Sequence, residues 1–154
     1  KDATMGLILN KPLYNFDTFQ FLKKMKINTV TDIKSSPTFF GGPVHLNQGF
    51  IIHSNEKKYK TSEDILDGVM ITSSEEILID ISKDKSPEHA KIFLGCAVWD
   101  EGQLDNEILE NSWIITNSDK DLIFHNHLEF SLWKKCLKGM GIDPSKLVSY
   151  SGSA

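Results

Sequence analysis

The sequence contains no arginine, because all 17 of its basic residues are lysine. Arginine supplies the planar guanidinium that pairs with carboxylates, phosphates and guanine through two hydrogen bonds, whereas lysine offers a single point charge. The chain also has 21 acidic residues and a formal net charge of −4, so its overall field repels nucleic acid. No helix–turn–helix pattern fits the predicted helices. We therefore expect no direct reading of DNA.

Cysteine and long apolar runs are also scarce. Cys96 and Cys136 are too few for a disulfide framework and form no C-x-x-C pair, which favours a reducing cytoplasm. No apolar run is long enough to cross a bilayer, and no signal peptide is visible, so we expect no membrane association. The chain does not begin with Met and opens almost directly into an apolar segment. We expect that an N-terminal portion with a strand precedes it.

The composition is that of a globular protein, with 40% hydrophobic and 25% charged residues over 154 positions. Alternation, apolar periodicity and turn residues predict strands at 5–10, 38–44, 49–54, 68–72, 91–99, 112–116 and 121–125. They predict helices at 16–26, 73–82, 101–111 and 128–140. This mixture without strict β-α-β alternation predicts one α+β domain over residues 1–154, a mixed, bent β-sheet forming a partial barrel flanked by helices.

Local signals fix several ends of these elements. Asn15 or Asp17 is expected to cap the first helix, and Ser73 with Glu76 forms a capping box for the second. Gly139 or Gly141 is expected to end the last helix. The Gly-Gly-Pro turn at 41–43, into which the segment 38–44 runs, predicts a hairpin between this strand and 49–54.

The segment 91–99, KIFLGCAVW, is nearly all apolar, which predicts a strand buried on both faces. Strict alternation places Cys96 on one face with Ile92, Leu94 and Val98, and Gly95 on the other with Phe93, Ala97 and Trp99. The small residues on the second face leave a shallow strip, against which a helix or, less commonly, a ligand packs.

The helix at 101–111 carries two polar residues near its apolar stripe. Asn111 lies about 20° from Leu104 around the helix axis and Glu107 lies about 60° from it. The structural interpretation makes Asn111 a buried, hydrogen-bonded bridge and Glu107 an edge residue that reaches solvent. The functional alternative is a polar pocket formed by Glu107, Asn111 and the turn after Trp99.

This stretch resembles the signature of the AlgH/YqgE family of small bacterial proteins. The matching positions are Leu94, Gly95, Ala97, Trp99, Gly102, Gln103, Leu104, Glu107, Asn111, Ser112 and Trp113. The segments MGLILNKPL and FFGGPVHLNQGFIIHS resemble the family's other motifs. The resemblance implies an α+β fold with a bent sheet. The family has no settled activity, and some members are described as transcriptional regulators.

Four positions depart from the family pattern. Cys96 stands where tyrosine is usual, Val98 where glycine is usual, and Lys11 where arginine is usual. Ser153 replaces the histidine of the C-terminal motif. A mechanism that requires that histidine is therefore not expected here.

Other motifs give weak chemical signals. The turn at Gly41–Pro43 lacks the spacing and the following helix of a phosphate loop. His125 and His127 share one face if extended, but zinc requires three or four ligands, so no metal site is predicted. Cys96 lies in a buried strand, where a thiol is usually inert. No cofactor is expected.

The sequence leaves two functions open. The first is a non-enzymatic binding or regulatory module, which affects transcription through a protein partner; the alternative is a hydrolase-like enzyme that uses Glu107 with His53 or His45. The candidate ligand-binding groove comprises Gly41, Gly42, Pro43, His53, Trp99, Gly102, Gln103, Glu107, Asn111 and Trp113.

Overall fold

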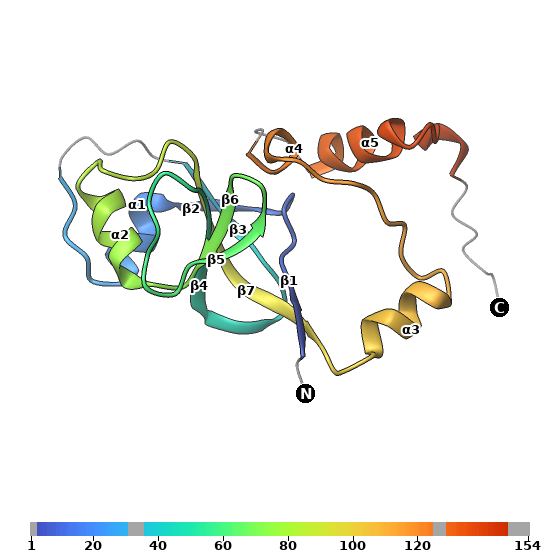
Figure 1. The fold of residues 1–154 in the computed structure, drawn as a ribbon. Coiled ribbons are helices and arrows are strands. Elements are labelled where there is room, and N and C mark those ends of the chain that lie inside the picture. Colours follow the sequence, from blue (N-terminus) through green and yellow to red (C-terminus); the bar gives the residue numbers. More distant parts are fainter. Residues whose placement is uncertain (1–2, 31–35, 125–128, 148–154) are drawn as a thin grey trace.

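The computed structural model describes residues 3–30, 36–124 and 129–147 (Figure 1). Its strands are β1 (Thr4–Gly6), β2 (Pro12–Asp17), β3 (Pro37–Phe40), β4 (Val44–Ser54), β5 (Glu63–Leu66), β6 (Val69–Thr72) and β7 (Ala90–Trp99). Its helices are α1 (Thr18–Lys24), α2 (Glu75–Ser82), α3 (Gln103–Leu109), α4 (Lys120–Phe124), α5 (Glu129–Gly139) and the short 3-10 helix η1 (Pro144–Lys146).

The strands form one mixed sheet in the order β2-β3-β7-β4-β6-β5, and β1 also pairs with β7. β7 lies at the centre, parallel to β3 and antiparallel to β4 and β1. A strand that is paired along both edges and largely covered on both faces is expected to be mostly apolar, and Lys91 is the only charged residue of β7. The predicted class, α+β with a mixed, bent sheet forming a partial barrel flanked by helices, is confirmed; the sheet is mixed and not closed.

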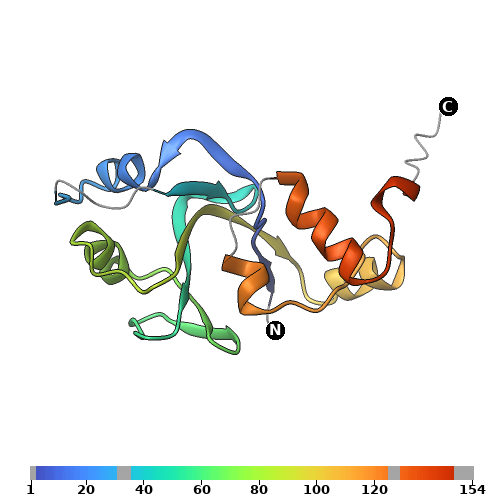
Figure 2. The same ribbon diagram turned by 90° about the horizontal axis from the view of Figure 1, so that it is seen from above.

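A separate hydrophobic cluster covers each face of the sheet. On one face, α1 and α2 contribute Phe21 and Ile77, which pack near Ile92 of β7. On the other face, Phe93 and Cys96 of β7 pack with Ile123 of α4. In both ribbon views α1 and α2 lie at one end of the molecule and α3 at the other, while α4 lies between them beside the sheet (Figures 1 and 2).

A bulge at Gly95 interrupts the alternation of β7. Gly95 has a φ of +71°, in the left-handed region, and the β4–β7 register shifts between Val44 and Gly49. Leu94 packs with the first cluster whereas Cys96 joins Phe93 in the second, so the predicted common face of Leu94 and Cys96 is wrong. One extra residue in a strand reverses the faces of all residues beyond it.

The helices begin and end as their local sequences dictate. Asp17 caps α1 in a capping box with Gln20, which confirms one of the two predicted caps. Ser74, one residue later than the predicted Ser73, accepts from the Glu76 amide and caps α2. Gly141, with a φ of +74°, follows the end of α5, where its amide donates to the Lys138 carbonyl. The left-handed residue turns the chain out of the helix.

Several predicted elements are wrong, chiefly because of pairing between distant segments. β3 and β4 do not form a hairpin, since β7 lies between them and pairs with both. The first strand ends at Gly6 instead of residue 10, and β2 begins at Pro12, where the sequence predicts no strand. Residues 112–116 form no strand, residues 120–124 form α4 instead of a strand, and β5 lies where the sequence predicts no strand.

Among the described residues, no helix is both long and apolar enough to cross a membrane.

Candidate functional site

Four residues of the predicted groove contact one another at the end of β7. The Glu107 carboxylate accepts hydrogen bonds from the indole nitrogens of Trp99 (3.1 Å) and Trp113 (2.8 Å) and from the amide of Gln103 (2.9 Å). The two indole rings meet edge to face, with centroids 5.8 Å apart. We call these four residues the indole–carboxylate cluster. It joins β7, α3 and the segment after α3.

The cluster keeps Glu107 ionised. Its three donors, the Trp113 indole first, then Gln103 and Trp99, lower the pKa of the Glu107 carboxyl below its ordinary value. A hydrogen bond to the charged form of an acid always acts in this direction. A general acid at neutral pH needs the opposite shift. The arrangement therefore favours a structural carboxylate over a proton donor.

Asn111 does not belong to the cluster, and its predicted burial is wrong. It is exposed and has a φ of +59°, directly after α3. Its backbone amide donates to the Ile108 carbonyl, and the backbone amide of Ser112 donates to the Glu107 carbonyl. This is the hydrogen-bond pattern of a Schellman motif. Asparagine tolerates the left-handed conformation better than most residues. Asn111 thus ends the helix. The prediction failed because it extended helical geometry by two residues.

α3 begins at another left-handed residue. Gly102 has a φ of +75° and precedes Gln103, the first residue of the helix. The Gln103 side chain accepts from the Asp100 amide and also reaches Glu107, so it connects the turn with the cluster. The helix has no buried residue, and its fixed points are therefore the cluster and the turn.

The turn at Gly41–Pro43 packs against the backbone of β7 rather than around a ligand. The Gly41 amide donates to the Leu94 carbonyl at 2.8 Å. A Cβ atom on Gly41 would lie 2.2 Å from the Gly95 oxygen, and one on Gly42 would lie 2.1 Å from the Cys96 carbonyl carbon. These glycines allow two backbones to touch, which fills the strip that the sequence assigned to a helix or a ligand.

His53 lies far from Glu107. It pairs with Ala90 at the first residue of β7, nine residues from Trp99, which is about 30 Å along an extended strand. His53 is fully buried, with its ring nitrogens 2.9 Å from the Ser54 oxygen and 3.3 Å from Ser62 Oγ. The three donors to Glu107 include no histidine. The geometry brings no Glu107–His53 pair together.

The remaining chemical candidates are unreactive or undescribed. Cys96 is 1% exposed, and burial raises the pKa of its thiol, so it behaves as a core residue. His45 is exposed on β4 with a φ of +53°. His125 and His127 lie outside the described residues. Within the described ranges, no three His, Cys, Asp or Glu residues gather as metal ligands would.

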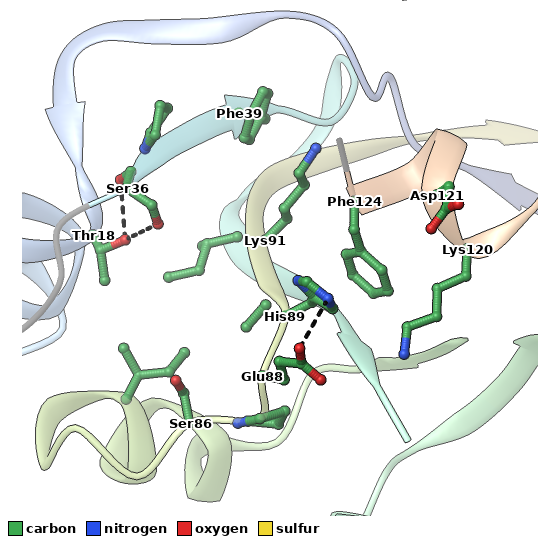
Figure 3. A pocket seen from close by; sticks show the side chains of 15 residues that line it. Thr18, Ser36, Phe39, Ser86, Glu88, His89, Lys91, Lys120, Asp121 and Phe124 are labelled. Carbon is green, nitrogen blue, oxygen red and sulfur yellow. Dashed lines mark hydrogen bonds and ion pairs between the residues drawn. The ribbon is translucent and has the colours of Figure 1, made fainter. Parts of the chain in front are cut away.

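The structure also has a cleft that the sequence analysis missed. Its volume is about 570 Å³, and it lies where the start of β7 meets β3, the loop after α2, and α4 (Figure 3). Small-molecule sites commonly have volumes of this size. The polar side chains that line it are Thr18, Ser36, Ser86, Glu88, His89, Lys91, Lys120 and Asp121.

Two lysines, Lys91 and Lys120, line this cleft, and Lys91 belongs to the central strand β7. The Lys91 ammonium donates to the Ile123 carbonyl of α4 at 2.9 Å and lies 5.4 Å from the centre of the Phe39 ring. Loss of solvent lowers the pKa of Lys91 below its ordinary value, because burial disfavours the charged form. One sequence signal could have identified it: Lys91 is the only charged residue in the otherwise apolar segment 90–99.

The fold and these sites define a small α+β protein with an open mixed sheet. The sequence matches the AlgH-like family over residues 1–145. A UPF0301 protein of Pectobacterium carotovorum is 35% identical over 158 residues, covering 100% of this chain and 84% of the relative. One from Xanthomonas campestris is 34% identical over 155 residues, covering 100% of this chain and 81% of the relative. The chain therefore belongs to the AlgH-like, UPF0301 family.

Solved structures agree with this assignment. The solution structure of the AlgH protein from Pseudomonas aeruginosa has a TM-score of 0.78 and 25% identity, and the match covers 99% of this chain and 80% of that one. A crystal structure of a Corynebacterium diphtheriae protein has a TM-score of 0.64 at 17% identity, covering 98% of this chain and 76% of the other. The second likeness shows the fold alone.

Proposed function

We propose that this AlgH-like chain is a non-enzymatic, cytoplasmic binding or regulatory module that contacts a protein partner. In this proposal any effect on transcription passes through the partner, since the chain has no arginine and a net negative charge. The free Cys96 and Cys136 thiols are in keeping with a reducing compartment.

A group of exposed apolar side chains near the end of β7 carries the proposal. Leu109 is 78% exposed, Ile115 61% and Trp113 48%, and Ile114 between them is also exposed. Single exposed apolar residues are common, but a group of large ones is typical of an interaction site. Trp113 touches Trp99 of β7, which places this group next to the strand end. We call Leu109, Trp113, Ile114 and Ile115 the apolar surface.

The charge around this surface indicates the chemistry of the partner. Residues 92–119 contain no lysine and six acidic residues: Asp100, Glu101, Asp105, Glu107, Glu110 and Asp119. Complementary potentials guide protein association and exclude wrong partners. We therefore propose a protein that presents lysine or arginine side chains around an apolar patch.

The hydrolase alternative gains no support from the geometry. Glu107 accepts three hydrogen bonds that lower the pKa of its carboxyl, and His53 is buried near the opposite end of β7. A catalytic acid–base pair needs both groups in one site within hydrogen-bond reach of the substrate. The binding proposal uses the same residues as structural support for the apolar surface.

The test is a comparison of partner capture by three forms of the full chain. Tagged wild type, Ile115→Ser and Ile65→Ser would be incubated with lysate of the native cell, and the bound proteins quantified by mass spectrometry. Ile65 is a matched control, because it is 46% exposed on the edge strand β5. We expect one protein to be captured by wild type and by Ile65→Ser, with at least a tenfold loss for Ile115→Ser.

Charge reversal sharpens this test. The double variant Asp105→Lys, Glu110→Lys should abolish capture, and rising salt should weaken capture by wild type, because exposed charge pairs are screened. The proposal fails if Ile115→Ser captures the same protein as well as wild type does. It also fails if the captured protein is unaffected by both salt and charge reversal.

A further inference from the structure

We propose that the cleft at the start of β7 binds a small organic anion, in which a carboxylate is joined to a flat, apolar body. This site is separate from the apolar surface, because it lies at the opposite end of β7. The inference does not rest on the proposed protein partner. It rests on the positions of charge, aromatic rings and hydroxyl groups around the cleft.

The basic and acidic side chains of the cleft differ in how far they are exposed to solvent. Lys91 is partly buried among apolar groups, with its ammonium beside the Phe39 ring and on the Ile123 carbonyl. The two acidic residues of the lining, Glu88 and Asp121, are both exposed. A cation inside a low-dielectric cleft attracts an anion more strongly than exposed acids at the rim repel it. The interior therefore favours a negatively charged group.

A flat wall stands beside this cation. The His89 and Phe124 rings are stacked, with centroids 5.0 Å apart and planes 19° apart (Figure 3). Ser54 fixes the backbone of His89, because its hydroxyl accepts from the His89 amide at 3.0 Å and its own amide donates to the His89 carbonyl at 3.0 Å. Glu88 Oε1 lies 3.8 Å from His89 Nε2. Such a wall suits an aromatic or other planar body.

The opposite wall supplies hydroxyl groups and apolar surface. Thr18 Oγ1 lies 2.9 Å from Ser36 Oγ and donates to the Ser36 carbonyl at 3.0 Å. Figure 3 shows this pair across the cleft from His89. The remaining lining is mainly apolar: Pro37, Phe39, Ile81, Pro87, Ala90, Ile92 and Phe124. Apolar walls combined with polar groups that orient the ligand are typical of small-molecule sites.

The test uses two probes of the same shape. 2-Naphthoate carries the carboxylate, and 2-naphthamide replaces it with a neutral amide. Each would be titrated into the ¹⁵N-labelled full chain, and binding followed by amide chemical shifts. We expect shifts at His89, Lys91 and Phe124, and an affinity for naphthoate at least about tenfold above that for naphthamide, since a hydrogen bond to a charged group contributes that much.

Two lysine variants distinguish binding at the cleft from a non-specific effect of lysine charge. Lys91→Met keeps the apolar stem and removes the ammonium, so it should bind the two probes equally. Lys11→Met is the matched control, because the Lys11 ammonium also lies over a ring, 4.7 Å from Phe40, but Lys11 is not part of the cleft lining. It should keep the full preference for naphthoate.

Three results would overturn the proposal. One is equal affinity of wild type for both probes, and this comparison holds even if Lys91→Met does not fold. Another is an unchanged preference in folded Lys91→Met. The third is a set of shifts confined to Trp113 and its neighbours, which would assign the probes to the apolar surface instead.

Discussion

At each end of β7 an aromatic pair meets edge to face and contacts a polar group, yet the two ends have different surroundings. At the Ala90 end, His53 and Tyr59 meet at 82° with centroids 5.3 Å apart, and both side chains are buried. At the Trp99 end, Trp99 and Trp113 meet at 75° with centroids 5.8 Å apart, and Trp113 is half exposed. The aromatic pair at the Ala90 end is therefore buried, whereas the pair at the Trp99 end is partly exposed to solvent.

The difference lies in what covers each pair. The His53–Tyr59 pair is enclosed by the sheet and α2, and the Tyr59 hydroxyl donates to Asp80 of α2 at 2.9 Å. The Trp99–Trp113 pair is held by α3, which buries none of its residues. A buried polar group must find its partner inside the protein, whereas an exposed one can exchange its partner for water. We therefore expect the first end to govern stability and the second to be available for binding.

The largest effect is expected where the turn at Gly41–Pro43 meets the middle of β7. Gly95→Ala places a methyl group 2.5 Å from the Gly42 oxygen and also strains a left-handed residue. We expect a loss of about 3–5 kcal/mol of unfolding free energy, measured by urea denaturation. Gly102→Ala is the control, since Gly102 has a similar φ but no atom within 4 Å. It should cost about 1–2 kcal/mol. Equal losses would contradict the packing argument.

The buried end can be broken at Ser62. Its hydroxyl oxygen accepts from the Tyr59 amide at 2.9 Å and lies 3.3 Å from His53 Nε2. Ser62→Ala leaves both groups without a partner in the core, so the unfolding free energy should fall by about 1–3 kcal/mol. Ser145→Ala removes an exposed hydroxyl that donates to Asp143, and should change stability by less than about 0.5 kcal/mol. Equal denaturation midpoints for the two variants would contradict the expectation that the Ala90 end of β7 governs stability.

The smallest effect on stability, but a clear spectroscopic one, is expected at Glu107. Glu107→Gln removes the charge that holds both indole nitrogens, so the near-ultraviolet circular dichroism of the Trp99–Trp113 pair should weaken. Because the folded pKa of Glu107 is lowered, its contribution is complete above the unfolded pKa and is lost as pH falls through the folded pKa. The wild-type signal should therefore weaken in acid, while that of Glu107→Gln stays flat. A variant that is more stable than wild type would contradict the structural role.

Much of the fold could be predicted from local pattern. The amphipathic segments at α1, α2 and α5 and the apolar run at β7 identified their elements, because burial on one face or two leaves a clear periodicity. Local pattern gave a wrong prediction for residues 121–125, which were expected to form a strand. A short apolar run is compatible with either a strand or a helix, and only its packing on the Phe93 face of the sheet makes it α4.

The candidate groove was predicted only in part. Trp99, Gln103, Glu107 and Trp113 do meet, since they lie within 15 residues of one another and a single turn brings them together. His53 does not join them, because β4 pairs it with Ala90 at the start of β7. The cleft around Lys91 was missed because its walls come from segments that are distant in the sequence.

The sequence by itself determined the family, the α+β class, the Asp17 cap of α1 and the short-range contacts around Glu107, because motifs, capping and short-range contacts act between near neighbours. The tertiary structure decided which strands pair with β7, which face Cys96 occupies beyond the Gly95 bulge, and where a cleft opens. These features depend on contacts between segments far apart in the chain. A one-residue shift in such a contact reverses every side chain that follows, and no local pattern records that shift.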